Sequence, residues 1–111
     1  MQIRPFAEPS TDGAIRFGLA MYEHEGDANA DWVSRAHGWF WSETGHLNVQ
    51  EVDTREGHRR RGHALKLLVE LVDCTGATEV DAVRTSEESE LLFARLAEAL
   101  PEVRVLNIDL G

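Results

Sequence analysis

The sequence contains a single cysteine, Cys74, among its 111 residues. One thiol excludes an internal disulfide framework, and zinc sites built from CxxC pairs need more cysteines. Long apolar runs are also missing. No stretch approaches membrane-spanning length, and the opening segment MQIRPF has no apolar run of signal-peptide length. We therefore expect a protein of the reducing cytoplasm that has no membrane partner.

Basic residues are scarce as well, since 11 Lys and Arg face 20 Asp and Glu, for a formal net charge of -9. Such a surface repels nucleic acid and anionic lipid. Four of the 11 basic residues nevertheless lie close together, at Arg55, Arg59, Arg60 and Arg61. This asymmetry favours a protein that binds a small polyanion at the basic segment and a cationic partner elsewhere. The lack of a second basic patch argues against a nucleic-acid-binding module.

Internal repeats, low-complexity tracts and interdomain linkers are absent too. We predict one domain over residues 1–111, because a chain of this length can bury a single core of modest size. The hydrophobic content of 42% and the charged content of 28% are those of an ordinary globular chain.

The N-terminal half predicts an antiparallel meander. A short strand in MQIRPF and a turn-rich EPSTDG precede IRFGLAMYE, a half-buried strand with apolar residues at alternate positions from Ile15 to Met21. WVSRAHGWFWS and LNVQEVDT are the next strands, and the short ETGH between them predicts an antiparallel pair. In the strand LNVQEVDT, Leu47 and Val49 lie on one face, whereas strict alternation would place Val52 on the opposite face. A β-bulge near Gln50 and Glu51 would reconcile the halves, although an accidental slip in a short strand is an equal alternative.

From Gly62 onward the period becomes helical. Leu65, Leu68 and Val72 lie on a broad apolar face. A narrow polar stripe of Lys66, Glu70 and Asp73 lies opposite, and TGAT ends this helix. EVDAVR is the next strand, residues 85–100 form a second helix that Pro101 stops, and VRVLNIDL is a closing strand. The predicted fold is mixed α/β (α+β): an antiparallel meander followed by a β-α-β-α-β unit with parallel crossovers.

The junction at Gly62 predicts an anion site. A helix N-terminus offers unpaired backbone N–H groups and a partial positive charge, and glycine lets a phosphate approach the backbone. The three arginines before Gly62 add positive charge, so the junction has what a pyrophosphate site needs.

The run Arg59-Arg60-Arg61-Gly62-His63-Ala64 resembles the Q/R-x-x-G-x-G/A signature of the GCN5-related N-acetyltransferase (GNAT) superfamily. The resemblance covers roughly residues 31–110, and the N-terminal part has no room for the family's usual two helices. It implies that acetyl-CoA is the cofactor and that the backbone N–H groups from Arg60 to Ala64 hold its pyrophosphate. It also implies that the segment Glu51–Thr54, with Val52, Asp53 and Thr54 in contact, pairs with the pantetheine arm. The Val52 N–H would polarise the thioester carbonyl.

The family often places its general base at positions that match Asn48 and Gln50, and neither side chain titrates here. Both could instead hold a relaying water. Glu51 is the first candidate for the base, with a solvated strand glutamate as the alternative, and His46 is a weaker candidate.

Two positions of the family's cofactor site also differ. Phe93 stands where many relatives carry a tyrosine that protonates the leaving thiolate, and Ser86 stands where an asparagine is common. We expect Phe93 to serve mainly in the core. A thiol of pKa about 8.5 leaves without an acid, so this difference does not exclude catalysis.

The remaining candidates favour structural roles. The histidine spacing matches no common zinc pattern, so no metal is expected. Trp39 and Trp41 share one face and favour core or homodimer packing, and Cys74 is expected to be a buried structural thiol.

The sequence thus predicts an acyl-CoA-dependent N-acyltransferase, which transfers an acetyl group directly to a primary amine: a small molecule, a protein N-terminus or a lysine. A catalytically silent module that binds acyl-CoA or a protein is the alternative.

Overall fold

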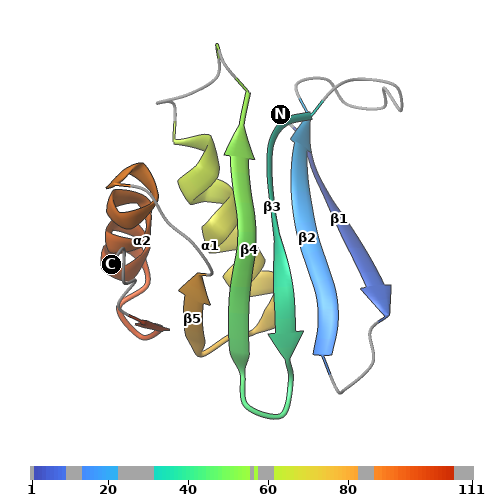
Figure 1. Ribbon diagram of the computed structural model, residues 1–111, viewed down its shortest axis with the longest axis vertical. Coiled ribbons are helices and arrows are strands. Elements are labelled where there is room, and N and C mark those ends of the chain that lie inside the picture. Colours follow the sequence, from blue (N-terminus) through green and yellow to red (C-terminus); the bar gives the residue numbers. More distant parts are fainter. Residues whose placement is uncertain are drawn as a thin grey trace.

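The computed structural model describes residues 2–9, 14–22, 32–55, 57, 62–82 and 87–106. A six-stranded sheet has the order β1-β2-β3-β4-β5-β6 (Figure 1). The first four strands pair antiparallel, whereas β5 pairs parallel with β4 and with β6. This is the predicted meander followed by a β-α-β-α-β unit. The elements are β1 (Gln2–Pro9), β2 (Ala14–Tyr22), β3 (Trp32–Trp41), β4 (His46–Thr54), α1 (His63–Thr75), β5 (Glu79–Ala82), α2 (Glu87–Ala99) and β6 (Arg104–Val105).

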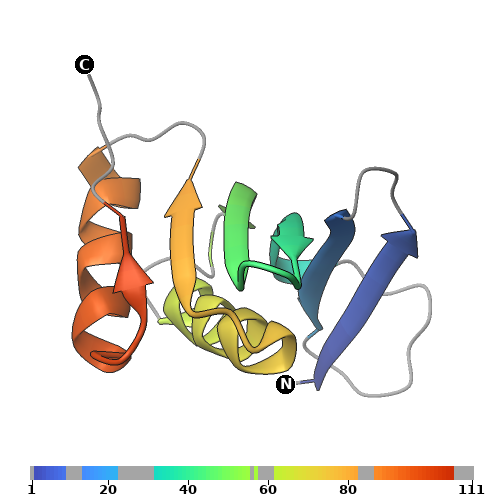
Figure 2. The same ribbon diagram turned by 90° about the horizontal axis from the view of Figure 1, so that it is seen from below.

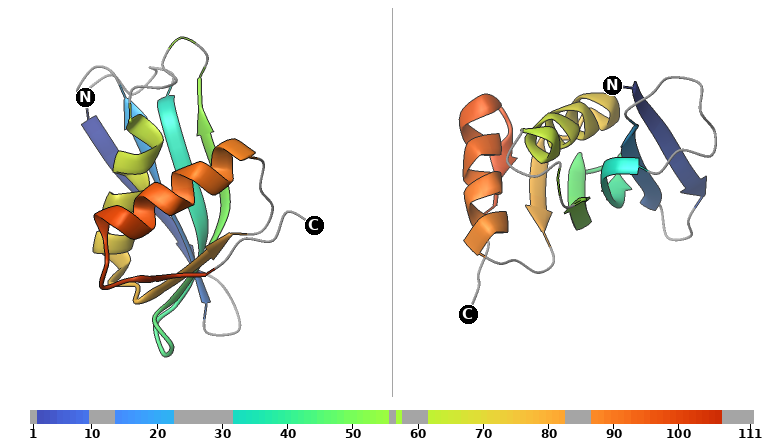
Figure 3. Two further views of the ribbon diagram at one scale, coloured as in Figure 1. Left: turned by 90° about the vertical axis from the view of Figure 1, so that its left-hand side faces the viewer. Right: turned by 90° about the horizontal axis from the view of Figure 1, so that it is seen from above.

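Both helices lie on the same side of the sheet. The chain moves from β4 to β5 to β6 in one direction, so crossovers of the usual right hand place α1 and α2 on one face. Figure 2 shows α1 beneath the central strands and α2 beside it, at the β5–β6 end; the two helices contact each other. Figure 3 shows the same layers from that end and from above. No helix among the described residues covers the opposite face, which we call the open face.

The core lies between α1 and the sheet. Leu67, Leu68, Leu71 and Val72 of α1 are buried, while Lys66 stays exposed as the polar stripe predicts. The most deeply buried partners come from five other elements: Leu19, Met21, Ala36, Leu47, Val80 and Leu96, each at most 1% exposed. Within the described residues, no helix is long and apolar enough to cross a membrane.

Two predictions about the N-terminal hairpin are wrong. Glu8 and Pro9 belong to β1, paired with Arg16 and Ile15, rather than to a connecting turn. Edge strands tolerate proline because the missing N–H costs them no ladder bond on the outer side. Ile15 is 44% exposed, although Leu19 and Met21 on the same face are buried. Ile15 lies one residue from the start of β2, outside the core cluster under α1.

The predicted β-bulge is confirmed. His37 pairs with Glu51 and Gly38 pairs with Val49, so Gln50 is the extra residue on β4. Gly38 makes the close approach possible, because a Cβ there would lie 2.1 Å from the Asn48 carbonyl oxygen. The bulge restores the phase of the strand, and Val52 packs against the same core as Val49.

The two halves of β4 have different neighbours. His46–Val49 pair with β3 on one side and with Glu79–Ala82 of β5 on the other. From the bulge to Thr54, the strand pairs with β3 alone among the described residues. One edge of this second half therefore carries backbone groups that the described part of the sheet does not use.

The C-terminal elements are described over part of their predicted length. The second helix covers Glu87–Ala99, and residues 85 and 86 of the predicted helix lie outside the described part. The closing strand is described for Arg104–Val105, and its predicted extension to residue 110 lies outside the described residues as well.

Candidate functional site

The N-terminus of α1 is built around a left-handed glycine. Gly62 has φ 79° and ψ 8° and makes no side-chain cap. Among the described residues, an ideal Cβ at Gly62 would meet no atom within 4 Å. The first hydrogen bond of the helix runs from the Lys66 N–H to the Gly62 carbonyl at 3.0 Å, so the N–H groups of Ala64 and Leu65 have no acceptor within the helix. The first turn contains no acidic residue, which leaves the dipole's positive end without an anion from the helix itself.

The other predicted cofactor residues are distributed around this end of β4 and α1. His63 and Ala64 form the first turn of the helix and are half-buried. Val52, Asp53 and Thr54 form the end of β4 and are also half-buried. Arg59, Arg60, Arg61 and Ser86 lie outside the described residues.

The end of β4 is tied firmly to β3. The hydroxyl of Ser34, which is fully buried, donates to the Asp53 carbonyl at 3.1 Å and lies 2.8 Å from the Thr54 hydroxyl. The Arg55 side chain donates from Nε to the Trp32 carbonyl at 2.7 Å and stacks on the Trp32 ring at 4.3 Å. Arg55 thus contacts β3 through its Nε and through the face of its guanidinium group.

Glu51, the predicted base, lies next to the bulge on the open face. Its Oε1 is 3.0 Å from Nη2 of Arg35, and its Oε2 is 3.9 Å from Nε2 of His37. The Glu51 side chain is 45% exposed, so solvent and a substrate can reach it.

The titration of His37 follows from its surroundings. Burial lowers the pKa of His37 below its ordinary value of 6.5, and Arg16 on β2 and Arg35 on β3 lower it further, while Glu51 on β4 opposes them. At neutral pH the imidazole is uncharged. Arg35 is therefore the one charged partner recorded for Glu51 among the described residues.

A second polar group lies in the first half of β4, also on the open face. Asn48 donates from Nδ2 to Oδ1 of Asp81 at 2.6 Å, and Gln50 donates from Nε2 to Oδ1 of Asn48. His46 lies between two carboxylates, with Nε2 3.3 Å from Asp81 and Nδ1 3.7 Å from Glu79. No group of His, Cys, Asp and Glu within the described residues has the arrangement of a metal site.

Phe93 and Cys74 differ in how they meet the expectations. Phe93 is 3% exposed and belongs to the core cluster, as expected for a packing residue; its contact with a carrier stays a prediction.

Cys74 is exposed, so the predicted buried thiol is wrong. It follows Glu70 by four residues, and helical geometry places it beside the polar stripe. Partial burial and then the carboxylates of Glu70 and Asp73 raise the pKa of this thiol, which disfavours a nucleophilic role.

Trp39 and Trp41 lie half-buried on the open face rather than in the core under α1. The Trp41 ring lies 5.9 Å from the ring of His46. The predicted dimer packing of these rings stays a prediction.

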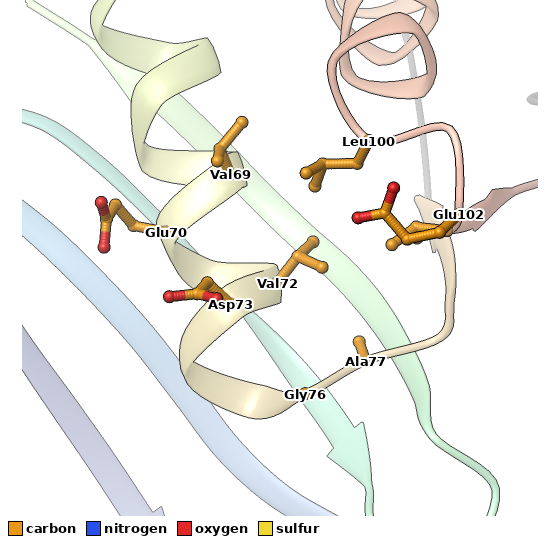
Figure 4. Close-up of a pocket in the computed structure, with 9 residues that line it drawn as sticks. Val69, Glu70, Val72, Asp73, Gly76, Ala77, Leu100 and Glu102 are labelled. Carbon is orange, nitrogen blue, oxygen red and sulfur yellow. The ribbon is translucent and has the colours of Figure 1, made fainter.

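A pocket of about 260 Å³ lies at the other end of α1. Figure 4 shows Val69 and Val72 facing Leu100 and Glu102 across it, with Glu70 and Asp73 on the far side of the helix. This pocket is near Gly76 rather than Gly62, so it is separate from the predicted carrier site.

Sequence reasoning gave no role to Gly38 beside the bulge or to Arg35, His37 and Asp81 on the open face. Gly38 carried a usable signal, because an isolated glycine inside a strand marks a bulge or a close backbone approach. Asp81 carried none, since its contact with Asn48 depends on the register between parallel strands joined by a whole helix.

Neither a protein-family model nor a curated protein matches the sequence. Among solved structures, the fold is similar to that of a nourseothricin acetyltransferase, with a TM-score of 0.53 and 17% sequence identity. The similarity covers 80% of this chain and 52% of the other, so the chain spans about half the length of that structure. The shared feature is the mixed α+β fold of an acetyltransferase.

Proposed function

We propose that the protein is an acyl-CoA-dependent N-acyltransferase that transfers an acetyl group to a primary amine. The observation that supports this most strongly is the sequence of three features along one stretch of chain. A bulge at Gln50 is followed by a strand segment that pairs with β3 alone among the described residues, and then by a helix that begins at a left-handed glycine. Together these features suit a long carrier that has an amide-containing arm and a diphosphate.

The residues present fit such a carrier. The N–H groups of Ala64 and Leu65, with the positive end of the α1 dipole, would hold the diphosphate, and Arg59, Arg60 and Arg61 would add positive charge. Backbone groups of the segment Glu51–Thr54 would pair with the amides of the arm as a neighbouring strand does. The open space in front of Gly62 leaves room for the phosphates.

The chemistry requires a base more than an acid. The carrier supplies a thioester, whose carbonyl carbon the amine attacks; the C–N bond forms, the C–S bond breaks, and a thiolate leaves. An alkylamine has a pKa near 10.4, so a group of the protein must accept a proton at neutral pH. Glu51 takes this role in the proposal, because it is exposed beside the bulge and its Oε2 faces a neutral imidazole. The Val52 N–H would stabilise the developing oxyanion.

One observation favours a second candidate, a silent binding module. Phe93 is buried in the core and has no hydroxyl, so the described residues offer no tyrosine acid at that position. A weakly basic thiolate needs little help to leave, and for this reason we prefer the enzyme.

Calorimetry with acetyl-CoA followed by release of free coenzyme A over a panel of amines tests both. The enzyme binds the carrier and releases coenzyme A with at least one primary amine. Binding without release on any amine supports the silent module, and no binding at high micromolar concentration refutes both.

A further inference from the structure

Three side chains on the open face form a continuous hydrogen-bonded row that ends at the bulge. Asp81 of β5 is in register with Asn48 of β4, and its Oδ1 accepts from Asn48 Nδ2 at 2.6 Å. Asn48 Oδ1 in turn accepts from Nε2 of Gln50, two residues along the same strand. We call these three residues the amide row.

The carboxylate determines the direction of the whole row. An ionised carboxylate accepts hydrogen bonds and cannot donate them, so Asn48 must turn its NH₂ toward Asp81 and its oxygen toward Gln50. Gln50 must then turn its own NH₂ toward Asn48. The group that remains at the end of the row is the Gln50 side-chain oxygen, which is an acceptor. Because each bond polarises the next, the negative charge of Asp81 also makes this oxygen a stronger acceptor.

Gln50 stands where an acceptor would be useful. It is the unpaired residue of the bulge and is exposed, and the residue that follows it is Glu51. Beyond Gln50, the edge of β4 no longer pairs with β5 among the described residues.

We propose that Gln50 is a positioning residue for the acceptor amine, with its side-chain oxygen accepting one N–H while Glu51 removes another proton. This inference rests on the proposed function and specifies its substrate class. An alkylamine arrives protonated at neutral pH, so a primary or a secondary amine still has an N–H for Gln50 after Glu51 has removed one proton. An alcohol has a single O–H and cannot satisfy both residues. The row therefore suits an amine rather than an alcohol.

The amide row makes Asp81 and Gln50 act together although both contact Asn48 rather than each other. In Asp81→Asn, residue 81 can donate as well as accept, so the row can reverse and Gln50 can present its NH₂. We expect about a tenfold rise in the KM for a primary amine, with the KM for acetyl-CoA unchanged. Gln50→Leu should give the same rise in the KM for the amine, again with the KM for acetyl-CoA unchanged. Asp81→Asn should add nothing further in the Gln50→Leu background.

Glu102→Gln provides the control, because it makes a carboxylate-to-amide change beside the pocket near Gly76 and away from the row. Glu79 is unsuitable, since His46 connects it to Oδ1 of Asp81. The control should leave all these values within twofold of wild type. Additive effects of Asp81→Asn and Gln50→Leu, or an unchanged KM for the amine in Gln50→Leu, would overturn the proposal.

A second measurement does not depend on activity. The side-chain NH₂ signals of Gln50 and Asn48 in an NMR spectrum should both shift in Asp81→Asn and stay in place in Glu102→Gln. An unmoved Gln50 signal in Asp81→Asn would refute the amide row. If wild-type protein releases no coenzyme A with any amine, the proposed function and the amine-positioning role both fail, whatever the NMR shows.

Discussion

The two ends of α1 carry the same residue in the same conformation and use it differently. Gly62 and Gly76 have φ values of 79° and 73°, and a Cβ at either would meet nothing within 4 Å. At the C-terminal end, the Gly76 N–H donates to the Val72 carbonyl at 2.9 Å, and the Thr75 hydroxyl donates to the Leu71 carbonyl at 2.8 Å. At the N-terminal end, no side chain caps the helix.

The same contrast runs along β4. The half that ends at Val49 pairs with strands on both sides, and the half that starts at the bulge pairs with β3 alone among the described residues. Within the described residues, hydrogen bonds close the helix at Gly76, no side chain caps it at Gly62, and the second half of β4 has one neighbouring strand instead of two. A left-handed glycine therefore ends this helix in two different surroundings, and we propose that the Gly62 end binds the carrier.

The largest expected effect comes from breaking this contrast directly. Gly62→Glu should weaken acetyl-CoA binding at least 100-fold in calorimetry, because a carboxylate would occupy the space and repel the diphosphate. Gly76→Glu is the matched control and should bind within twofold of wild type. Both should lose about 1–2 kcal/mol of stability, since a side chain in the left-handed region is strained. Equal carrier affinity in the two variants would contradict the assignment of the N-terminal end.

Glu51→Gln sharpens the contrast along β4 by separating binding from chemistry. We expect kcat at pH 7 to fall about 100-fold, the usual contribution of a general base. Carrier affinity should stay within twofold, and stability should change little because the ion pair with Arg35 is half-exposed. An unaltered pH–rate profile would remove Glu51 as the base.

Gly38→Ala tests whether the bulge depends on close backbone approach. The added Cβ would lie 2.1 Å from the Asn48 carbonyl oxygen, so β3 and β4 must move apart. We expect a loss of about 1–3 kcal/mol in the free energy of unfolding by denaturant, as for other overpacked sites. Gly57→Ala, where a Cβ would meet nothing within 4 Å, is the control for space, although its φ of 94° adds strain of its own. A Gly38 variant as stable as wild type would show that the strands separate at no cost.

The smallest expected effect is the pH dependence that His37 contributes. Its pKa is lowered mainly by burial, so below pH 6.5 the unfolded chain binds a proton that the folded chain resists. The contribution to stability is present above pH 6.5 and is lost as the pH falls from there through the lower folded-state pKa. His37→Gln should therefore reduce the drop in Tm between pH 7.5 and 5.5 by about 2 °C. The same drop in both proteins would show that His37 titrates alike in the folded and unfolded states.

Most features that depend on residues close together in the sequence were predicted correctly. The polar stripe of α1, its end at Gly76, the hairpin turn before His46 and the bulge at Gln50 all follow from spacing within a few residues, and the structure confirms them. The features that were not predicted depend on residues far apart in the sequence. The contact between Asp81 and Asn48 depends on parallel register, and the exposure of Ile15 depends on where α1 ends over the sheet.

The predicted site divides in the same way. Gly62 at the start of α1 and the strand segment Glu51–Thr54 could be predicted from the sequence, because each depends on residues that are close together in the chain. The open-face groups that contact Glu51, Arg35 and His37, come from β3 and could not be inferred without the fold. Both residues affect what Glu51 can do as a base. Arg35 pairs with one oxygen of the Glu51 carboxylate, and His37 lies near the other oxygen and is neutral because its pKa is lowered.

Backbone amide NMR during titration with coenzyme A is the most direct way to see which end of α1 meets the carrier. The N–H signals of Gly62, Ala64 and Leu65 should shift and saturate together, while those of Gly76 and Ala77 stay in place. Saturable shifts at Gly76 with none at Gly62 would mean that the diphosphate binds elsewhere and that the account of this helix is wrong.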